Sequence, residues 1–246
     1  MNDGRFDGWS AADLAARCQL PRVVLPDSVE STMDVGHALA AEGTPAGTLV
    51  LTDRQTMGRG RNGRAWTSAP GDSLTLTLIE RPSDHHAVAV LSLRLGITLA
   101  SCLQPFAAGP LSLKWPNDIV ENGGKLLGIL VEARWRELQP DWVAIGIGLN
   151  VRRPVLQGAV GLAEGAPRVE ILAALVSAMR QAAALSGELT AEEQEAFAAR
   201  DCARGRRIVE PVRGMVAGIA PNGALLVETD SGLVACVTGS LVFAEA

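Results

Sequence analysis

The character of the sequence changes at Gly205, and this change limits the folds open to the chain. Before it, apolar strand-like runs are interspersed with segments of helical periodicity. After it, residues 207–243 contain only short β runs, separated by the turn signals Asn222-Gly223 and Ser231-Gly232. We therefore predict two domains: residues 1–204 form the larger one, and residues 205–246 form a small all-β barrel.

The larger domain is predicted to be α+β, with a mixed or antiparallel sheet packed with helices. The run SLTLTLIE at residues 73–80 alternates, which indicates a strand with one polar face. Asn122-Gly123-Gly124 predicts a turn and hence a hairpin. Strands are predicted at 47–54, 73–80, 111–115, 125–133 and 142–151, and helices at 10–18, 31–43, 84–103, 169–185 and 191–203.

Charge and apolar content exclude several classes of protein. The net charge of −5 disfavours an extensive nucleic-acid surface, because such a surface needs clustered Lys and Arg. The most membrane-like stretch, residues 87–103, has Arg94 at its middle and is short, so we expect a buried helix. Four cysteines without C-x-x-C spacing favour neither a zinc site nor a disulfide framework. The N-terminus lacks signal-peptide features, so a cytoplasmic protein is expected.

A glycine- and arginine-rich loop is predicted between the strands at 47–54 and 73–80. Residues 58–63 match G-x-G-x-x-G, but no long helix can follow, so a dinucleotide fingerprint is disfavoured. Arg59, Arg61 and Arg64 offer three guanidinium groups that suit phosphate or carboxylate. Trp66 offers a face for stacking on a ring. The alternative is a solvated basic loop with Trp66 in the core.

Residues 114–118, Lys-Trp-Pro-Asn-Asp, lie at a strand end. If the hairpin forms, Lys125 lies near Asp118, and a buried lysine beside an aspartate stays charged and can stabilise an anion. An ordinary Asp–Lys pair with a core tryptophan is the alternative. For Asn150, a turn-forming role is the alternative. For Ser31, the alternative is a helix N-cap, and the free N–H groups of a helix N-terminus also bind anions.

Taken together, five segments in order resemble a biotin protein ligase. They are Ser31-Thr32, the Gln55–Trp66 motif, Lys114–Asp118, Gly124–Glu132 and Gly146–Asn150. The resemblance implies a catalytic domain like that of class II synthetases and a C-terminal SH3-like barrel. It further implies that biotin and ATP form biotinyl-5′-AMP, and that the biotinyl group then passes to a lysine of a biotin carboxyl carrier protein.

The resemblance also assigns expected roles. The catalytic residues are expected to be Lys125, Arg61 and Asp118. Biotin is expected to contact Ser31, Thr32, Gln55, Gly58, Arg59, Arg61, Lys125, Gly128 and Gly146. ATP is expected to contact Arg61, Arg64, Trp66, Lys114, Asn117, Asp118 and Asn150. Mg²⁺ is expected with ATP, although the sequence indicates no dedicated metal cage.

Some features depart from the family or leave alternatives open. The family often has Ser-Thr-Asn at the first motif, whereas Met33 stands here. Longer members carry an N-terminal DNA-binding domain; too few residues precede Ser31 for one, so no DNA binding is expected. A lipoate or octanoate ligase or transferase of the same fold is the alternative enzyme. A non-catalytic ligand-binding regulator or an RNA-binding protein is the alternative of another class. A homodimer is possible.

Overall fold

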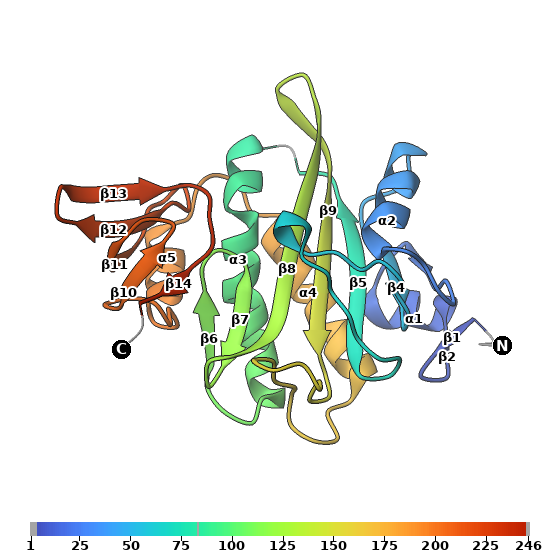
Figure 1. Cartoon of the computed structure of the whole chain (residues 1–246). Coiled ribbons are helices and arrows are strands. Elements are labelled where there is room, and N and C mark those ends of the chain that lie inside the picture. Colours follow the sequence, from blue (N-terminus) through green and yellow to red (C-terminus); the bar gives the residue numbers. More distant parts are fainter. Residues whose placement is uncertain (1–3, 83, 245–246) are drawn as a thin grey trace.

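The computed structural model describes residues 4–82 and 84–244 and contains a seven-stranded sheet at its centre (Figure 1). Its strand order is β3-β4-β5-β9-β8-β7-β6. The strands are β3 (Arg22–Val24), β4 (Thr48–Thr52), β5 (Ser73–Glu80), β6 (Leu111–Lys114), β7 (Asp118–Glu121), β8 (Gly124–Arg136) and β9 (Gln139–Asn150). Among these strands β3 and β4 pair in parallel and the others antiparallel, so the predicted mixed sheet is confirmed.

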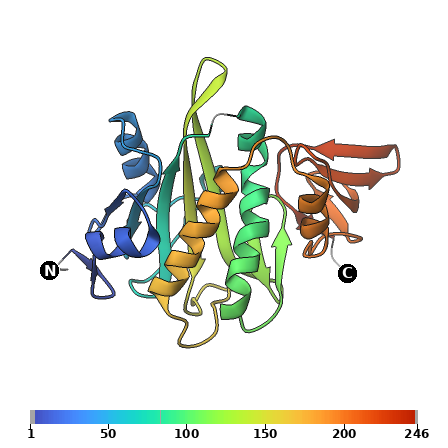
Figure 2. The same cartoon turned by 180° about the vertical axis from the view of Figure 1, so that it is seen from behind.

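Helices cover both faces of this sheet, but unequally. The two long helices α3 (His85–Leu103) and α4 (Arg168–Ala183) lie side by side across one face, with the short α1 (Ala11–Cys18) next to α4 (Figure 2). On the other face, α2 (Thr32–Ala41) packs on β4, β5 and β9. The rest of that face is left to loops, which creates room for a site.

Strand β5 was predicted to have one polar face, and in the structure that face is buried. Its alternation is real, since Leu76 and Leu78 enter the core under α3 and α4. However, all eight residues are buried. Helix α2 comes close enough to cover the polar face because it carries a glycine: a Cβ on Gly36 would lie 2.9 Å from Cγ2 of Thr77. The threonines of β5 therefore belong to the interior of the molecule.

Helix α3 is a core helix in this fold. By length and composition alone, residues 85–106 could cross a membrane, yet 56% of the most apolar window is buried inside the protein. Arg94 in its middle is 1% exposed and pairs with Glu193, with 2.6 Å between Nε and Oε1. Glu193 belongs to α5 (Ala191–Ala198), so a buried ion pair fastens α5 to α3.

Helix α5 ends earlier than the sequence analysis predicted, at Ala198 rather than near residue 203. The backbone beyond it becomes extended and pairs with the edge strand β6. The N–H of Leu113 donates to the carbonyl of Arg200 (2.7 Å), and the N–H of Cys202 donates to the carbonyl of Leu113 (3.0 Å). Sheet hydrogen bonding therefore replaces the last helical turn.

The C-terminal strands form a second sheet with the order β13-β12-β11-β10-β14, next to β6 in Figure 1. They are β10 (Arg207–Glu210), β11 (Gly214–Ile219), β12 (Leu225–Thr229), β13 (Gly232–Cys236) and β14 (Val242–Phe243). This confirms the predicted small β unit of SH3-like type. The buried Trp115 connects it to the larger sheet, because its Nε1–H donates to the carbonyl of Gly223 (3.0 Å).

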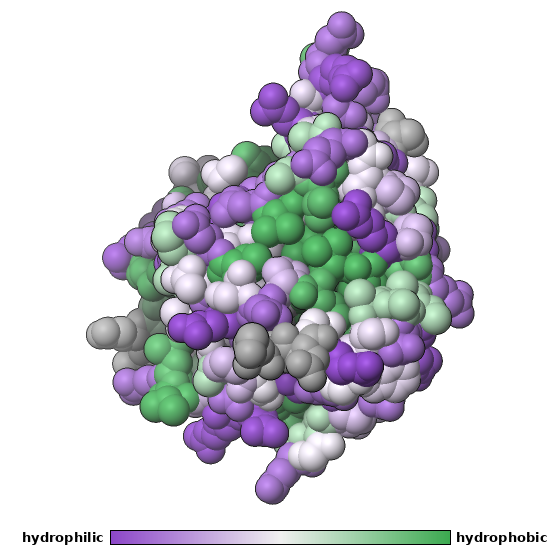
Figure 3. Space-filling view, turned by 90° about the vertical axis from the view of Figure 1, so that its right-hand side faces the viewer, coloured by the Kyte–Doolittle hydropathy of each residue, from purple (hydrophilic) through white to green (hydrophobic). Residues whose placement is uncertain are grey.

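The smaller elements lie at the periphery and in the loops. They are β1 (Arg5–Phe6), β2 (Trp9–Ser10), and the 3-10 turns η1 (Arg61–Gly63) and η2 (Gln104–Phe106). On the side of the molecule that carries α1 and α2, apolar side chains gather at the centre of the face within a polar surround (Figure 3). Helix α2 leaves Val35, Ala38 and Leu39 partly or fully exposed.

Candidate active site

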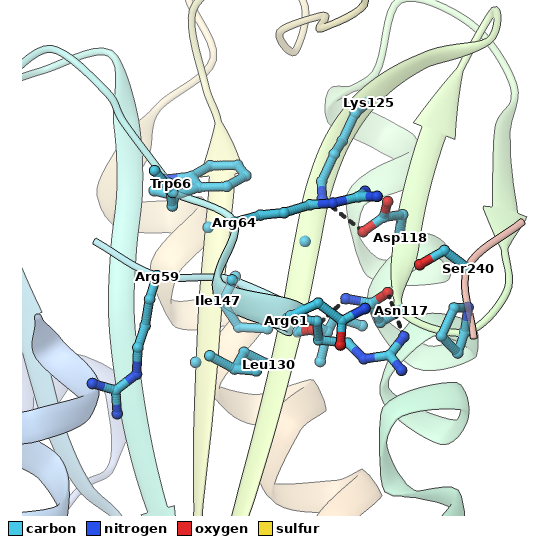
Figure 4. Close-up of a pocket in the computed structure, with 18 of the residues that line it drawn as sticks. Arg59, Arg61, Arg64, Trp66, Asn117, Asp118, Lys125, Leu130, Ile147 and Ser240 are labelled. Atoms are coloured by element: carbon cyan, nitrogen blue, oxygen red, sulfur yellow. Dashed lines mark hydrogen bonds and ion pairs between the residues drawn. The ribbon is translucent and has the colours of Figure 1, made fainter. Parts of the chain in front are cut away.

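A cavity of ≈ 600 Å³ lies between the loop after β4 and the face of the sheet that α3 and α4 leave free (Figure 4). This volume is in the range of small-molecule sites. Its wall brings together most of the predicted site residues. They are Ser31, Thr32, Gln55, Arg59, Arg61, Arg64, Trp66, Lys114, Asn117, Asp118, Lys125, Gly128 and Gly146.

The floor of the cavity follows directly from strand register. Cross-strand partners point to the same face of a sheet. Thr75 of β5 pairs with Gly148 of β9, and Gly148 pairs with Gly128 of β8. Gly128 pairs with Asp118 of β7, which in turn pairs with Lys114 of β6. One row across five strands thus gives a glycine floor with a carboxylate and an ammonium group at one end.

The two floor glycines make room for Trp66. A Cβ on Gly148 would lie 2.4 Å from Cε2 of the indole, and one on Gly128 would lie 3.6 Å from Cζ3. The indole therefore lies directly on the backbone of the sheet, where a side chain would displace it. Its Nε1 is buried and has no hydrogen-bond partner. Trp66 thus presents a flat apolar face inside the cavity.

Lys125 and Asp118 form the ion pair predicted from the hairpin, with 2.8 Å between Nζ and Oδ1 (Figure 4). The lysine is not buried: 39% of its side chain is exposed, because the pair lies at the open side of the cavity. Its Nζ also lies 5.8 Å from the centre of the Trp66 ring. The ammonium group therefore faces the cavity from one side with a carboxylate and a ring beside it.

The opposite end of the cavity is neutral and polar. Ser31 caps α2, as predicted, by accepting from the N–H of Met33 (3.3 Å). Oε1 of Gln55 accepts from both the N–H (2.7 Å) and the hydroxyl (3.1 Å) of Thr32. The hydroxyl of Thr77 donates to the same threonine hydroxyl (2.9 Å). These bonds hold the Gln55 amide in place.

Met33 also lines this end of the cavity, where the family often has an amide. Its side chain is buried against the strand: a Cβ on Gly146 would lie 2.8 Å from Sδ. Ala40, Ile79 and Ala144 complete a small apolar cluster around it. The thioether therefore fills space next to the glycine and offers no hydrogen-bond donor.

Two predicted ligand contacts lie behind the cavity wall. At Gly58, a Cβ would lie 2.4 Å from the carbonyl oxygen of Trp66, and its own carbonyl accepts from the N–H of Trp66 (2.8 Å). Asn150 is buried, and its Nδ2 donates to the carbonyl of Lys125 (3.2 Å). Gly58 closes the base of the loop and Asn150 supports the backbone of Lys125.

The three loop arginines diverge (Figure 4). Arg64 extends toward the Lys125–Asp118 pair. Nη1 of Arg61 lies 3.4 Å from Oδ1 of Asn117 and 3.5 Å from the carbonyl of Gly239. Burial lowers the pKa of Arg61, Asp118 raises it and Arg64 lowers it further, with a net decrease. The group nonetheless stays charged, because an arginine pKa lies far above neutrality.

Arg59 points away from that pair, toward α2 and β8, where it contacts Asp34 and Glu132. Burial works to lower the pKa of Arg59, but the two carboxylates raise it, and the net change is upward. The charge of Arg59 is therefore balanced by the protein itself. The charges of Arg61, Arg64, Lys114 and Lys125 face the cavity with Asp118 as the carboxylate on its wall.

The contribution of the C-terminal sheet to the cavity was not predicted from the sequence. Residues 240–243 line the cavity, and the ring of Phe243 lies 5.5 Å from Nζ of Lys114. Leu156, from the loop after β9, lines it as well. No motif marks these residues, since they reach the cavity only through the packing of the second sheet and the path of a loop.

Comparison with known proteins agrees with this geometry. The model of the Biotin/lipoate A/B protein ligase family matches residues 25–150, and that of the Biotin protein ligase C terminal domain matches residues 207–243. A solved biotin protein ligase from Aquifex aeolicus, in complex with biotin and ATP, superposes with a TM-score of 0.73 at 25% identity. The superposition covers 92% of this chain and 100% of that one.

Curated relatives match a shorter part of the chain. The Bifunctional ligase/repressor BirA of Bacillus spizizenii is 38% identical over 132 residues, which are 53% of this chain and 41% of that protein. The Biotin–[acetyl-CoA-carboxylase] ligase of Mycobacterium tuberculosis is 33% identical over 153 residues, 60% of this chain and 52% of that one. The chain thus spans about two fifths to one half of their lengths. From the family match, the fold and the motifs together, the chain belongs to the biotin/lipoate A/B protein ligase family and carries a C-terminal domain of the biotin protein ligase type.

Proposed function

We propose that the protein is a biotin–[acetyl-CoA-carboxylase] ligase. In the first step, a carboxylate oxygen of biotin attacks the α-phosphorus of ATP, the bond to the β-phosphate breaks, and biotinyl-5′-AMP and pyrophosphate form. In the second step, a lysine amine of a biotin carboxyl carrier domain attacks the acyl carbon. AMP leaves, an amide forms, and the amine loses its proton.

The observation that carries this proposal is the charge of the cavity wall. Both reactants of the first step are anions, so catalysis depends on positioning them and neutralising charge. Five cationic side chains and one carboxylate line the described cavity. Lys125, placed between Asp118 and Trp66, is the group we assign to the oxygens of the carboxylate and α-phosphate. Arg61 is assigned to the same oxygens from the loop.

The neutral end suits a ureido ring, which offers both donors and acceptors. Gln55 and Thr32 present an amide and a hydroxyl there. Gly146 and Gly128 line the cavity, and we assign them to the apolar body of biotin. Arg64, Lys114 and Asn117 are assigned to the nucleotide, with Trp66 covering the adenine. Asp118 is assigned to accept the proton of the incoming amine, since it is the carboxylate nearest Lys125.

Magnesium is expected to arrive with ATP. No cluster of three or more His, Cys, Asp or Glu able to hold a metal occurs in the part of the chain that the structure describes. Mg²⁺ is commonly bound by one or two carboxylates together with substrate phosphates. Asp118 fits that arrangement as the single carboxylate, and the ion would neutralise phosphate charge.

The proposal extends to partners and location. A carrier domain of a carboxylase is the proposed macromolecular substrate, and the cytoplasm is the proposed location. A homodimer is the proposed assembly, and measurement of the mass in solution tests it. The repressor activity named for the Bacillus relative is not transferred to this chain, because the match covers 41% of that protein.

Pyrophosphate release tests the activity and its substrate. The protein is incubated with ATP and either biotin or lipoate, and pyrophosphate is followed over time. Release with biotin and none with lipoate is expected, because lipoate has no ureido group for Gln55 and Thr32. Release with lipoate alone would replace this proposal by a lipoate ligase of the same fold.

A further inference from the structure

Arg59 is held by two carboxylates that come from different elements. Its Nη1 contacts Oδ1 of Asp34 on α2, and its Nη2 lies 3.1 Å from Oε2 of Glu132 on β8. About a third of each of the Arg59 and Glu132 side chains is exposed, so either contact alone contributes little. Together they fix the guanidinium in one orientation, away from Lys125 (Figure 4).

Glu132 is itself fixed from the other side. Its Oε2 lies 2.9 Å from Nε2 of His37, and Nδ1 of the same ring lies 3.0 Å from Nε1 of Trp142. Indole nitrogen can only donate, so Nδ1 must accept. The proton of a neutral His37 is therefore on Nε2 and is donated to Glu132. The result is one continuous network from β9 through α2 and β8 to the loop.

The network fastens the loop close to its start. Helix α2 holds Gln55 through Thr32 and holds Arg59 through Asp34. At the other end of the loop, Trp66 lies on the floor glycines. The segment 55–66 is thus attached at both ends across the cavity, and the arginine network is its attachment on the side of the neutral, ureido-binding end.

We propose that Asp34, Glu132 and His37 act as positioning residues that keep this loop closed over the bound ligand and slow its escape. The inference rests on the proposed function for the identity of the ligand. These three side chains lie outside the cavity wall and touch no reacting atom. They act through Arg59, so they govern retention of biotinyl-5′-AMP and leave the rate of its formation at saturation unchanged.

Glu132→Gln is the most direct test, because it keeps the size of the side chain and removes its charge. Glu228→Gln is the matched control, since Glu228 is an exposed glutamate on β12 of the C-terminal sheet, in a different sheet from the network. Dissociation of preformed biotinyl-5′-AMP is measured by chase with unlabelled ligand. About a fivefold faster dissociation is expected for Glu132→Gln, and none for the control. Single-turnover adenylation at saturation is expected to equal that of the wild type.

A double-mutant cycle with Arg59→Gln separates this role from others. If Glu132 acts through Arg59, the double variant loses ligand no faster than Arg59→Gln alone. Unchanged dissociation in Glu132→Gln, additive effects, or an equally slowed chemical step would overturn the proposal.

Hydrogen exchange of residues 55–66 provides a readout that does not depend on activity. Faster exchange in ligand-free Glu132→Gln and Asp34→Asn than in the wild type is expected, with unchanged melting temperature for Glu132→Gln. Equal exchange would overturn the network's role. A wild-type protein that forms no adenylate would refute the proposed function, and this exchange experiment would still decide the role of the network.

Discussion

Lys125 owes its place in the cavity to a single hairpin. Strand β7 ends in Glu121, the turn follows, and Lys125 returns on β8 to face Asp118 at 2.8 Å. Its backbone is supported by Asn150, and its ammonium group lies above Trp66. Every other cation on the described wall comes from a loop or from another strand, so none can take over its position.

Lys125→Ala is expected to slow adenylation by about 10²–10³-fold at saturating substrates, the range found when one group that stabilises transition-state charge is removed. Single-turnover pyrophosphate release measures it. Arg136→Ala is the control, because that side chain is 81% exposed on the distal hairpin. Adenylation at the wild-type rate in Lys125→Ala would contradict the assigned role.

Gly148 is required by the position of Trp66. In Gly148→Ala, the new Cβ would lie 2.4 Å from the indole, so the ring must move off the floor. Overpacking of this kind costs roughly 1–3 kcal/mol. We expect biotinyl-5′-AMP to bind about tenfold more weakly, measured by titration calorimetry. Gly96→Ala is the control, since its Cβ meets Leu113 at an ordinary 3.5 Å; equal affinity in both variants would refute the idea.

At the scale of elements, most of the fold was predictable from local signals. Caps identified the starts of α1, α2 and α3, because Ser10, Ser31 and Asp84 each accept from the first turn as expected. Two features that could not be predicted from the sequence depend on tertiary packing. The end of α5 is set by pairing of residues 200–202 with β6, and the burial of β5 is set by α2.

The same holds for the candidate site. Motifs brought out the loop arginines, the Lys114–Asp118 segment and Lys125, and the structure gathers these around one cavity. Their directions could not be predicted, because a flexible loop with several arginines is compatible with many orientations. Only the folded arrangement places Arg59 against Asp34 and Glu132 and places Arg61 beside Asn117.

The attachment of α5 to α3 rests on a buried charge. Burial works to raise the pKa of Glu193, but Arg94 and the capping bond of Thr190 lower it overall. Glu193→Gln leaves Arg94 buried without a counter-ion, so the free energy of unfolding at pH 7 is expected to fall by about 3–5 kcal/mol. Urea denaturation measures this.

The pH dependence follows from the direction of the shift. The folded pKa of Glu193 lies below its ordinary 4.5, so the stabilisation is fully present above that value and is lost as the pH falls through the folded pKa. Wild type and Glu193→Gln should therefore converge in stability as the pH drops below about 4.5. A difference that stays constant on acidification would contradict the charge-based account.

At the scale of the whole molecule, the two sheets share one cavity. Residues 240–243 of the C-terminal sheet lie on its wall, and Trp115 connects that sheet to β6. The position of the C-terminal sheet therefore contributes to the shape of the cavity at the end that we assign to the nucleotide.

Trp115→Phe removes the bond to Gly223 while keeping an aromatic ring in the core. A lost hydrogen bond that leaves a carbonyl unpaired costs about 1–3 kcal/mol. We expect the free energy of unfolding to fall by that amount and the KM for ATP to rise. Trp135→Phe is the matched control, because Trp135 is 45% exposed on the distal hairpin. Equal stability of the two variants would argue against coupling through Trp115.

The central claim is that this cavity joins biotin to a protein lysine through an adenylate. The most direct test is intact-mass spectrometry of a biotin carboxyl carrier domain after incubation with the protein, ATP and biotin. The account predicts a gain of one biotinyl group, dependent on ATP and lost when the acceptor lysine is replaced. An unchanged carrier mass, with the wild-type protein folded and supplied with Mg²⁺, would contradict it.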